Sequence, residues 1–176
     1  MGIRISIFRR IKVILIVAVC CVISSSCFTV TYSTKGVSRV TGTVSVQYFE
    51  NMARTVEAGL SQQVTDDLKD YLQSNTGLIL VTGTGEYNFE GSITTYEANK
   101  PVAITAGDQA AKNRFTIALK VKFTSDANPD MDFESTFSRY EDYSSNTDFE
   151  SVKAELTEEL LKLLIEDIFN RAFVNW

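Results

Sequence analysis

The chain of 176 residues contains no histidine. Histidine is the side chain most often used as an acid or base near neutral pH, and it is the commonest metal ligand. Without it the familiar serine–histidine pair of hydrolases cannot form, and no cluster of cysteine and histidine supports a transition metal. The sequence therefore predicts a protein that is not an enzyme and that holds neither a cofactor nor a metal ion.

The chain also lacks a hydrophobic run long enough to span a membrane. Four basic residues, the last of them Lys12, precede eleven apolar residues at 13–23. A membrane-spanning helix needs about 20 such residues, whereas the hydrophobic region of a signal peptide needs roughly 7–15. Residues 1–26 are therefore predicted to be a signal peptide.

Cysteines are few, and their positions are informative. Cys20 and Cys21 lie inside the apolar run, so the mature chain keeps only Cys27, which follows three serines. The stretch resembles a bacterial lipobox, with Ser24 where leucine is usual. We predict that acyl chains such as palmitate on Cys27 anchor the protein. Multiple chains, at about 0.8 kcal/mol per buried methylene, make such an anchor permanent. Cleavage nearby without lipidation, or an uncleaved anchor, are the alternatives.

Positive charge is scarce beyond the signal peptide. From Cys27 onward the chain carries 13 basic and 22 acidic residues, a net charge of −9. This charge argues against binding to nucleic acid, because phosphate contacts need a positive surface. No internal repeat and no second domain is evident. Residues 27–41 are predicted to be a lipidated tether, and residues 42–176 a single domain.

The first half of this domain shows two periodicities. Val44, Val46 and Tyr48 alternate with polar residues, which predicts a half-buried strand at 43–51. Apolar residues from Val56 onward then recur every three or four positions, which predicts a helix at 55–73. Strands are predicted at 78–81 and 89–96, and the glycine-rich segment that starts at Gly83 between them is predicted to be a hairpin turn.

The second half begins with the clearest strand of the chain. At 115–125, five apolar residues alternate with polar ones that include Lys120 and Lys122. A turn at 126–130 and an antiparallel strand at 133–140 follow. Thr147 and Glu150 form a capping-box pattern that predicts the start of a long helix. The fold class predicted is α+β: an antiparallel sheet of four to five strands, with two long helices packed on one face.

One basic band stands out in this acidic chain. Residues 100–122 contain five basic residues against a single acid, Asp108. Such cations on one face of a sheet could pair with phosphate or carboxylate groups. The alternative is that they solvate an exposed strand and protect it from aggregation. The candidate anion-binding residues are Lys112, Arg114, Lys120 and Lys122, with Arg139 on the neighbouring strand.

Three segments, VSVQYFEN (44–51), LSQQVTDDLKDYL (60–72) and EDIFNRAFVNW (166–176), resemble the LptE family of lipopolysaccharide-assembly lipoproteins. The resemblance spans nearly all of the chain from Cys27 to Trp176 and rests on distributed patterns. It implies a periplasm-facing, lipid-anchored α+β domain of the outer membrane. Its partners would be an LptD-type β-barrel, which it plugs and helps to assemble, and lipopolysaccharide, which it binds during transport. The basic band is the candidate contact for this anionic glycolipid.

Two other functions compete with this interpretation. A periplasm-facing lipoprotein could instead bind a soluble ligand or a cell-wall component in a cavity between its sheet and its helices. The dense apolar stripes of the sequence argue that this core is filled. An adhesin-like structural subunit is the third possibility, and it would need surface display and exposed strand edges.

Overall fold

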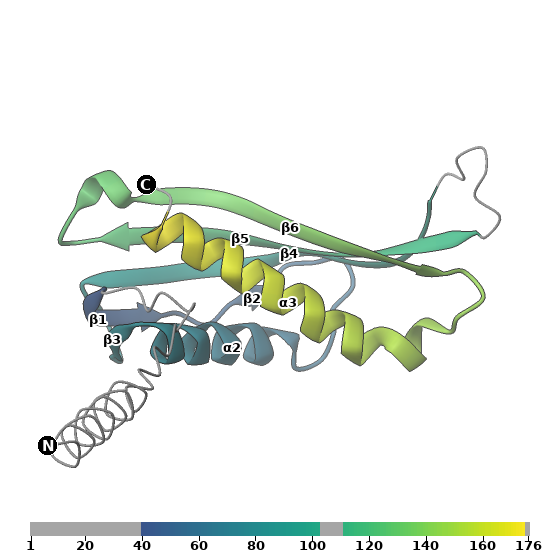
Figure 1. Cartoon of the computed structure of the whole chain (residues 1–176), viewed down its shortest axis with the longest axis horizontal. Helices are drawn as coiled ribbons and strands as arrows, with labels where there is room; N and C mark the ends of the chain where they lie inside the picture. The colour runs from purple at the N-terminus through teal and green to yellow at the C-terminus, as the bar shows by residue number, and fades with distance from the viewer. Residues whose placement is uncertain (1–39, 103–110, 175–176) are drawn as a thin grey trace, which may run out of the picture. The chain divides into compact units, whose positions relative to one another are not determined.

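The computed structural model describes residues 40–102 and 111–174, which form one six-stranded sheet and two helices (Figure 1). The order across the sheet is β3-β1-β4-β5-β6, with β2 paired to β4. The strands are β1 (Thr41–Val46), β2 (Glu50–Asn51), β3 (Gly77–Leu80), β4 (Tyr87–Pro101), β5 (Lys112–Ser125) and β6 (Phe133–Ser144). The helices are α2 (Leu60–Asn75) and α3 (Phe149–Phe173). Cys27 and the predicted signal peptide lie outside the described residues.

The predicted α+β class is confirmed, and both helices pack on the same face of the sheet. Helix α2 lies against β1 and β3, whereas α3 lies against β5 and β6 (Figure 1). Strand β5 determines which face is buried, because its alternating apolar side chains are fully inaccessible to solvent. These are Phe115, Ile117, Leu119, Val121 and Phe123. The opposite face of the sheet carries no helix among the described residues, and we call it the open face.

The sheet is antiparallel only in part. Strands β4, β5 and β6 pair antiparallel as expected, but β1 pairs parallel with both β3 and β4. The reason is the position of α2, which links β1 to β3. A strand that follows such a helical crossover returns in the direction of the first strand, whereas antiparallel neighbours can be joined by a tight turn.

The predicted hairpin turn at Gly83 is wrong. Strands β3 and β4 flank β1 on opposite sides, with Leu80 and Tyr87 both in register with Val44, so the loop 81–86 must cross β1. We call this segment the crossing loop. A Cβ atom on Gly85 would lie 2.9 Å from the carbonyl oxygen of Thr43, and therefore only glycine permits so close an approach.

A network of hydrogen bonds holds the crossing loop on β1. The side-chain oxygen of Asn88 accepts from the N–H of Gly85 at 2.8 Å and from the hydroxyl of Ser45 at 2.6 Å. Its amide nitrogen donates to the carbonyl of Gly85 at 2.8 Å. The N–H of Glu86 donates to the hydroxyl of Thr43 at 3.0 Å. One buried amide thus satisfies both backbone groups of the glycine at the crossing point.

The predicted first strand is interrupted, so Tyr48 does not share the buried face of Val44. Val46 pairs with Phe89 and Glu50 pairs with Ser92, which leaves one extra residue between them on the first strand, as in a β-bulge. The bulge turns Tyr48 outward, with 56% of its surface exposed, and buries Phe49 completely. The ring of Phe49 packs on Gly91, where a Cβ atom would come within 2.3 Å of it.

Both helices begin later than the sequence patterns suggest. Helix α2 starts at Leu60 after Gly59, whose φ of 82° is left-handed, and Val56 lies exposed in the preceding loop. The predicted capping box is also wrong. The N-cap of α3 is Asp148, which places Glu150 at the second helical position, one residue too early for a capping box, and its carboxylate pairs with Lys153 at 2.8 Å.

The core between the sheet and the helices is filled. Val44, Leu68, Phe89, Leu160 and Ile168 have no accessible surface. The C-terminal part of α3 adds an aromatic cluster in which the ring of Phe173 lies edge-on to three sheet residues: Tyr87, Phe89 and Phe123. Within residues 40–102 and 111–174, neither helix is long and apolar enough to cross a bilayer.

Candidate functional site

The open face of the sheet gathers four of the five predicted anion-binding residues. Because side chains alternate along a strand, the even-numbered residues of β5 project away from the helices. Lys112, Lys120 and Lys122 are exposed on this face, and Arg114 is half-buried there. The even-numbered residues of β6, which include Glu134, share the face through the antiparallel register. The candidate basic surface therefore has acidic neighbours.

The cations at one end of this face are neutralised by acids on both adjacent strands. Lys120 pairs with Glu134 of β6 at 2.5 Å, and Lys122 pairs with Glu90 of β4 at 3.4 Å. The hydrogen bond from Lys120 lowers the pKa of the Glu134 carboxyl below its usual value. Both pairs are about half-exposed, so each stabilises the fold only slightly. Their main effect is to cancel the positive charge of Lys120 and Lys122.

Arg114 is held in a fixed orientation. Its guanidinium makes two hydrogen bonds to the carboxylate of Asp142, at 2.7 and 2.9 Å. It also lies over the ring of Tyr140, 3.6 Å from the ring centroid. The hydrogen bonds from Arg114 hold the pKa of Asp142 below its usual value. Although Asp142 takes up much of the charge of Arg114, the exposed ring beside it provides a flat contact surface.

The remaining cations of the band lie at the end of the β4–β5 pair. Lys100 is the register partner of Arg114 across these two strands, and Lys112 is near the start of β5. Neither lysine has an ion pair within residues 40–102 and 111–174. Lys100, Arg114, Thr116 and Tyr140 line a recess of about 390 Å³. The least compensated positive charge of the open face is therefore at this recess, not at Lys120 and Lys122.

Arg139 is not part of this surface. It is odd-numbered in β6 and so projects towards the helices, where its guanidinium makes two hydrogen bonds with Asp167 of α3, at 2.6 and 2.7 Å. These bonds raise the pKa of Arg139 above its usual value. The same alternation that buries Phe133 and partly buries Phe137 places Arg139 on their side of the sheet. The sequence pattern therefore contained the signal that separates this arginine from the others.

The sequence analysis also missed the residues that decide which cations remain available. Glu90, Glu134 and Asp142 were not recognised because cross-strand partners depend on the register, which a single sequence does not provide. Tyr140 could have been found, since alternation along the predicted strand at 133–140 places it on the same face as Glu134. Its aromatic surface is 54% exposed, which is unusual for a large side chain on a polar sheet face.

Carboxylates also accumulate between the two helices. Asp67, Asp70, Glu158 and Lys162 line a recess of about 330 Å³ between α2 and α3. Partial burial, with Asp70, Asp66 and Glu158 nearby, raises the pKa of Asp67 above its usual value. Within the described ranges, no three acidic or cysteine side chains are grouped closely enough to hold a metal ion. The carboxylates form an acidic helical surface.

Comparison with known protein families matches residues 41–172 to the model described as LptE, lipopolysaccharide-assembly. Comparison with curated protein sequences gives no match. The matched range contains every described strand and nearly all of α3. The three segments quoted above begin and end within or close to this range.

Solved structures share the fold at low sequence identity. A hypothetical protein from Chlamydia trachomatis has a TM-score of 0.54 at 8% identity, covering 77% of this chain and all of that one. A minor lipoprotein from Acinetobacter baumannii has a TM-score of 0.51 at 13% identity, covering 76% and 93% of the two chains. A protein from Xanthomonas campestris of the family DUF330 has a TM-score of 0.50 at 13% identity, covering 77% and 87%. At these identities the likeness shows the fold alone.

Proposed function

Since the chain belongs to the LptE family of lipopolysaccharide-assembly proteins, we propose that it is an outer-membrane lipoprotein that plugs and helps to assemble an LptD-type β-barrel. In this role it assists the delivery of lipopolysaccharide to the outer leaflet. The LptE family is a family of non-enzymatic lipoproteins, and the absence of histidine from the chain agrees with such a role. The observation that carries the proposal is the family match across three quarters of the chain.

The polarity of the two faces supports a position inside a barrel. The lumen of an outer-membrane barrel is polar, and a domain that fills it needs a polar surface. On the open face, exposed lysines and glutamates are paired across the strands, as between Lys120 and Glu134. On the opposite side, the outward surfaces of the helices carry carboxylates. Both outer surfaces of this two-layer domain therefore suit a hydrated environment.

We propose that lipopolysaccharide contacts the recess formed by Lys100, Arg114 and Tyr140, together with Lys112. Phosphate groups bind strongly to cations that lack an acidic partner, and Lys100 and Lys112 meet this condition best. Lys120 and Lys122 stay in the proposal as weaker contributors because Glu134 and Glu90 compete for them. Arg139 is assigned to the contact between β6 and α3 instead.

Two variants with the same change in net charge test this assignment. Reversal of Lys100 and Lys112 to glutamate should weaken binding of purified lipopolysaccharide by about tenfold or more, because uncompensated cations are lost. Reversal of Lys120 and Lys122 should weaken it much less. Binding is measured by surface plasmon resonance, with circular dichroism to verify folding. Equal losses in the two variants would show an effect of bulk charge, and unchanged binding in both would remove the basic band from the proposal.

A pull-down tests the proposed barrel partner. The tagged full chain, extracted from membranes in mild detergent, should recover a large β-barrel protein in a stable complex. Depletion of the chain should leave that barrel misassembled. A tagged outer-membrane lipoprotein of unrelated fold provides the control. Recovery of soluble proteins alone would argue against the plug and for the periplasmic binding alternative.

That alternative, a lipoprotein with a ligand cavity between sheet and helices, has little support among the described residues. The side chains that would line such a cavity, including Phe89, Leu119 and Leu164, are packed with no accessible surface. The proposed domain organisation stays as the sequence predicts it: a signal peptide at 1–26, a lipidated tether at 27–41 that starts with Cys27, and the LptE-like domain at 42–176.

A further inference from the structure

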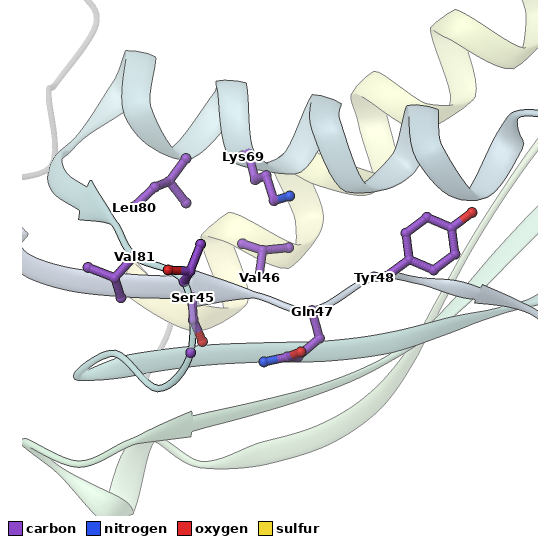
Figure 2. Close-up of a pocket in the computed structure, with 9 residues that line it drawn as sticks. Ser45, Val46, Gln47, Tyr48, Lys69, Leu80 and Val81 are labelled. Atoms are coloured by element: carbon purple, nitrogen blue, oxygen red, sulfur yellow. The ribbon is translucent and has the colours of Figure 1, made fainter.

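A recess of about 410 Å³ lies where β3 separates from β1, beneath α2 (Figure 2). It is lined by apolar side chains of both strands, Val46, Leu80 and Val81, and by Lys69 of α2. Figure 2 shows Lys69 extending from the helix towards β1, with Val46 and Leu80 extending towards the helix. The recess is separate from the basic recess of the open face, with which it shares no lining residue.

The backbone of the first strand is uncovered along this recess. The N–H of Val81 donates to the carbonyl of Val44 at 2.9 Å, after which the chain leaves as the crossing loop. The first strand continues beyond this point, where the N–H of Gln47 donates to the carbonyl of Phe89 at 2.8 Å. Successive peptide groups of a strand point to opposite edges. The N–H and C=O of Val46, one residue before Gln47, therefore face the recess, where no strand lies within the described residues.

This edge of the sheet lacks the usual protection against strand pairing. Residues 76–85, which include β3 and most of the crossing loop, contain no charged side chain, and Ile79 is 66% exposed. The opposite edge strand, β6, carries Arg139 and Glu141 on the helix-facing side of the sheet, and such inward-pointing charges discourage the addition of a strand. Of the two edges, the one at β1 and β3 is therefore the edge that can accept an extended segment.

Lys69 determines the charge of the segment that fits. Within the described residues its ammonium group forms no ion pair, in contrast to Lys120, Lys122 and Lys153, and the rest of the recess is uncharged. An extended peptide can contact both the uncovered strand edge and Lys69, by pairing its backbone with the edge and placing one side chain towards the helix. A carboxylate at that position would form a charge-assisted hydrogen bond with the ammonium group.

We propose that this recess binds an extended segment of a partner protein that carries an acidic side chain. The segment continues the line of β3, pairs with the backbone N–H and C=O of Val46, and places its carboxylate on Lys69. The apolar residues two positions before and after the acid share its face and contact Val46 and Leu80. The assignment does not depend on lipopolysaccharide binding or on the anchor, because none of the residues concerned belongs to either.

Three fluorescein-labelled heptapeptides provide the probe, measured by fluorescence polarisation with the full chain in detergent micelles. Each has valine two positions before and two positions after a central residue and threonine at the other positions. The central residue is glutamate in the first peptide and lysine in the second. The third repeats the glutamate peptide with N-methyl groups on alternate amides, which removes backbone donors without changing charge. We expect the glutamate peptide to bind at least tenfold more tightly than the other two.

Two protein variants locate the site. Lys69→Glu should weaken binding of the glutamate peptide at least tenfold and should favour the lysine peptide instead. Lys162→Glu, which makes the same change of charge on α3, should leave binding unchanged. The proposal is overturned if the three peptides bind alike, if none binds at millimolar concentration, or if Lys162→Glu has the effect expected of Lys69→Glu. None of these outcomes bears on recovery of the barrel or on binding of lipopolysaccharide.

Discussion

Replacement of Asn88 by leucine tests whether the crossing loop is held by a single side chain. Leucine has the same branching and the same number of side-chain heavy atoms but cannot form hydrogen bonds, so the N–H and carbonyl of Gly85 and the hydroxyl of Ser45 all lose their partner. All three residues of this network are buried. A buried polar group without a partner costs about 1–3 kcal/mol. The hydroxyl can rotate towards another acceptor, which leaves two backbone groups unsatisfied.

The expected loss is therefore about 2–6 kcal/mol of unfolding free energy, summed over these two groups. A domain of this size is stable by about 5–15 kcal/mol, so the variant should lose a large part of its stability. Ser45→Ala is the matched control. It removes one hydroxyl and its hydrogen bond, while the oxygen of Asn88 still accepts from Gly85, and it should cost about 1 kcal/mol or less.

Urea denaturation followed by far-ultraviolet circular dichroism provides the measurement, because the midpoint reports stability when the slope is unchanged. A loss below about 1 kcal/mol for Asn88→Leu would refute the reasoning, since it would show that water replaces the amide at no cost. Equal losses of stability in Asn88→Leu and in Ser45→Ala would refute the reasoning as well. The loss would then come from the hydroxyl of Ser45 and not from the backbone of the crossing loop.

Three further predictions concern the bulge, the helical carboxylates and the anchor. Gly91→Ala should destabilise the fold by about 1–3 kcal/mol in thermal unfolding, because its methyl group overlaps the ring of Phe49. In a Phe49→Leu background, Gly91→Ala should cost less, because the ring that the methyl group overlaps is gone. If the costs of the two substitutions simply add in the double variant, this contact is contradicted. Asp67→Asn should stabilise the fold at pH 7, because a raised pKa means that the charged form is disfavoured in the folded state. This gain should disappear as the pH falls through the pKa of Asp67 and the native carboxyl becomes neutral, and a gain that is the same at pH 3 and pH 7 would contradict it. Cys27→Ala should release the protein from membranes into the soluble fraction, whereas membrane retention with an uncleaved N-terminus would show a spanning segment instead.

The antiparallel half of the sheet could be predicted because its signals are local. In β5, large apolar residues recur at every second position from Phe115 to Phe123, with Ala118 the one further buried residue between them. In α3 the buried side chains recur along the helix to Phe173. The parallel half depends on long-range pairing. The sequence does not tell which strand residues 77–80 pair with. Pairing with residues 41–44 and pairing with residues 87–90 would bury the same apolar side chains.

The bulge illustrates a second limit. Alternation alone favours Tyr48 over Phe49 as the buried residue, and it is the absence of a side chain at Gly91, on another strand, that creates the space for Phe49.

The candidate site was predictable to a similar extent. The alternation of side chains along the predicted strand is enough to place Lys112, Arg114, Lys120 and Lys122 on one face of the sheet. The acids that neutralise some of them depend on register and on side-chain rotamers.

The crossing loop also affects how the domain withstands mechanical force. Because β1 lies between two parallel neighbours, a pull on the chain at Val40 along the strand acts on both hydrogen-bonded ladders at once and in shear. Bonds loaded in this way must yield together, whereas a strand peeled from an edge loses them one at a time. Tension that enters through the N-terminal segment is thus resisted by a strand that is hydrogen-bonded along both of its edges.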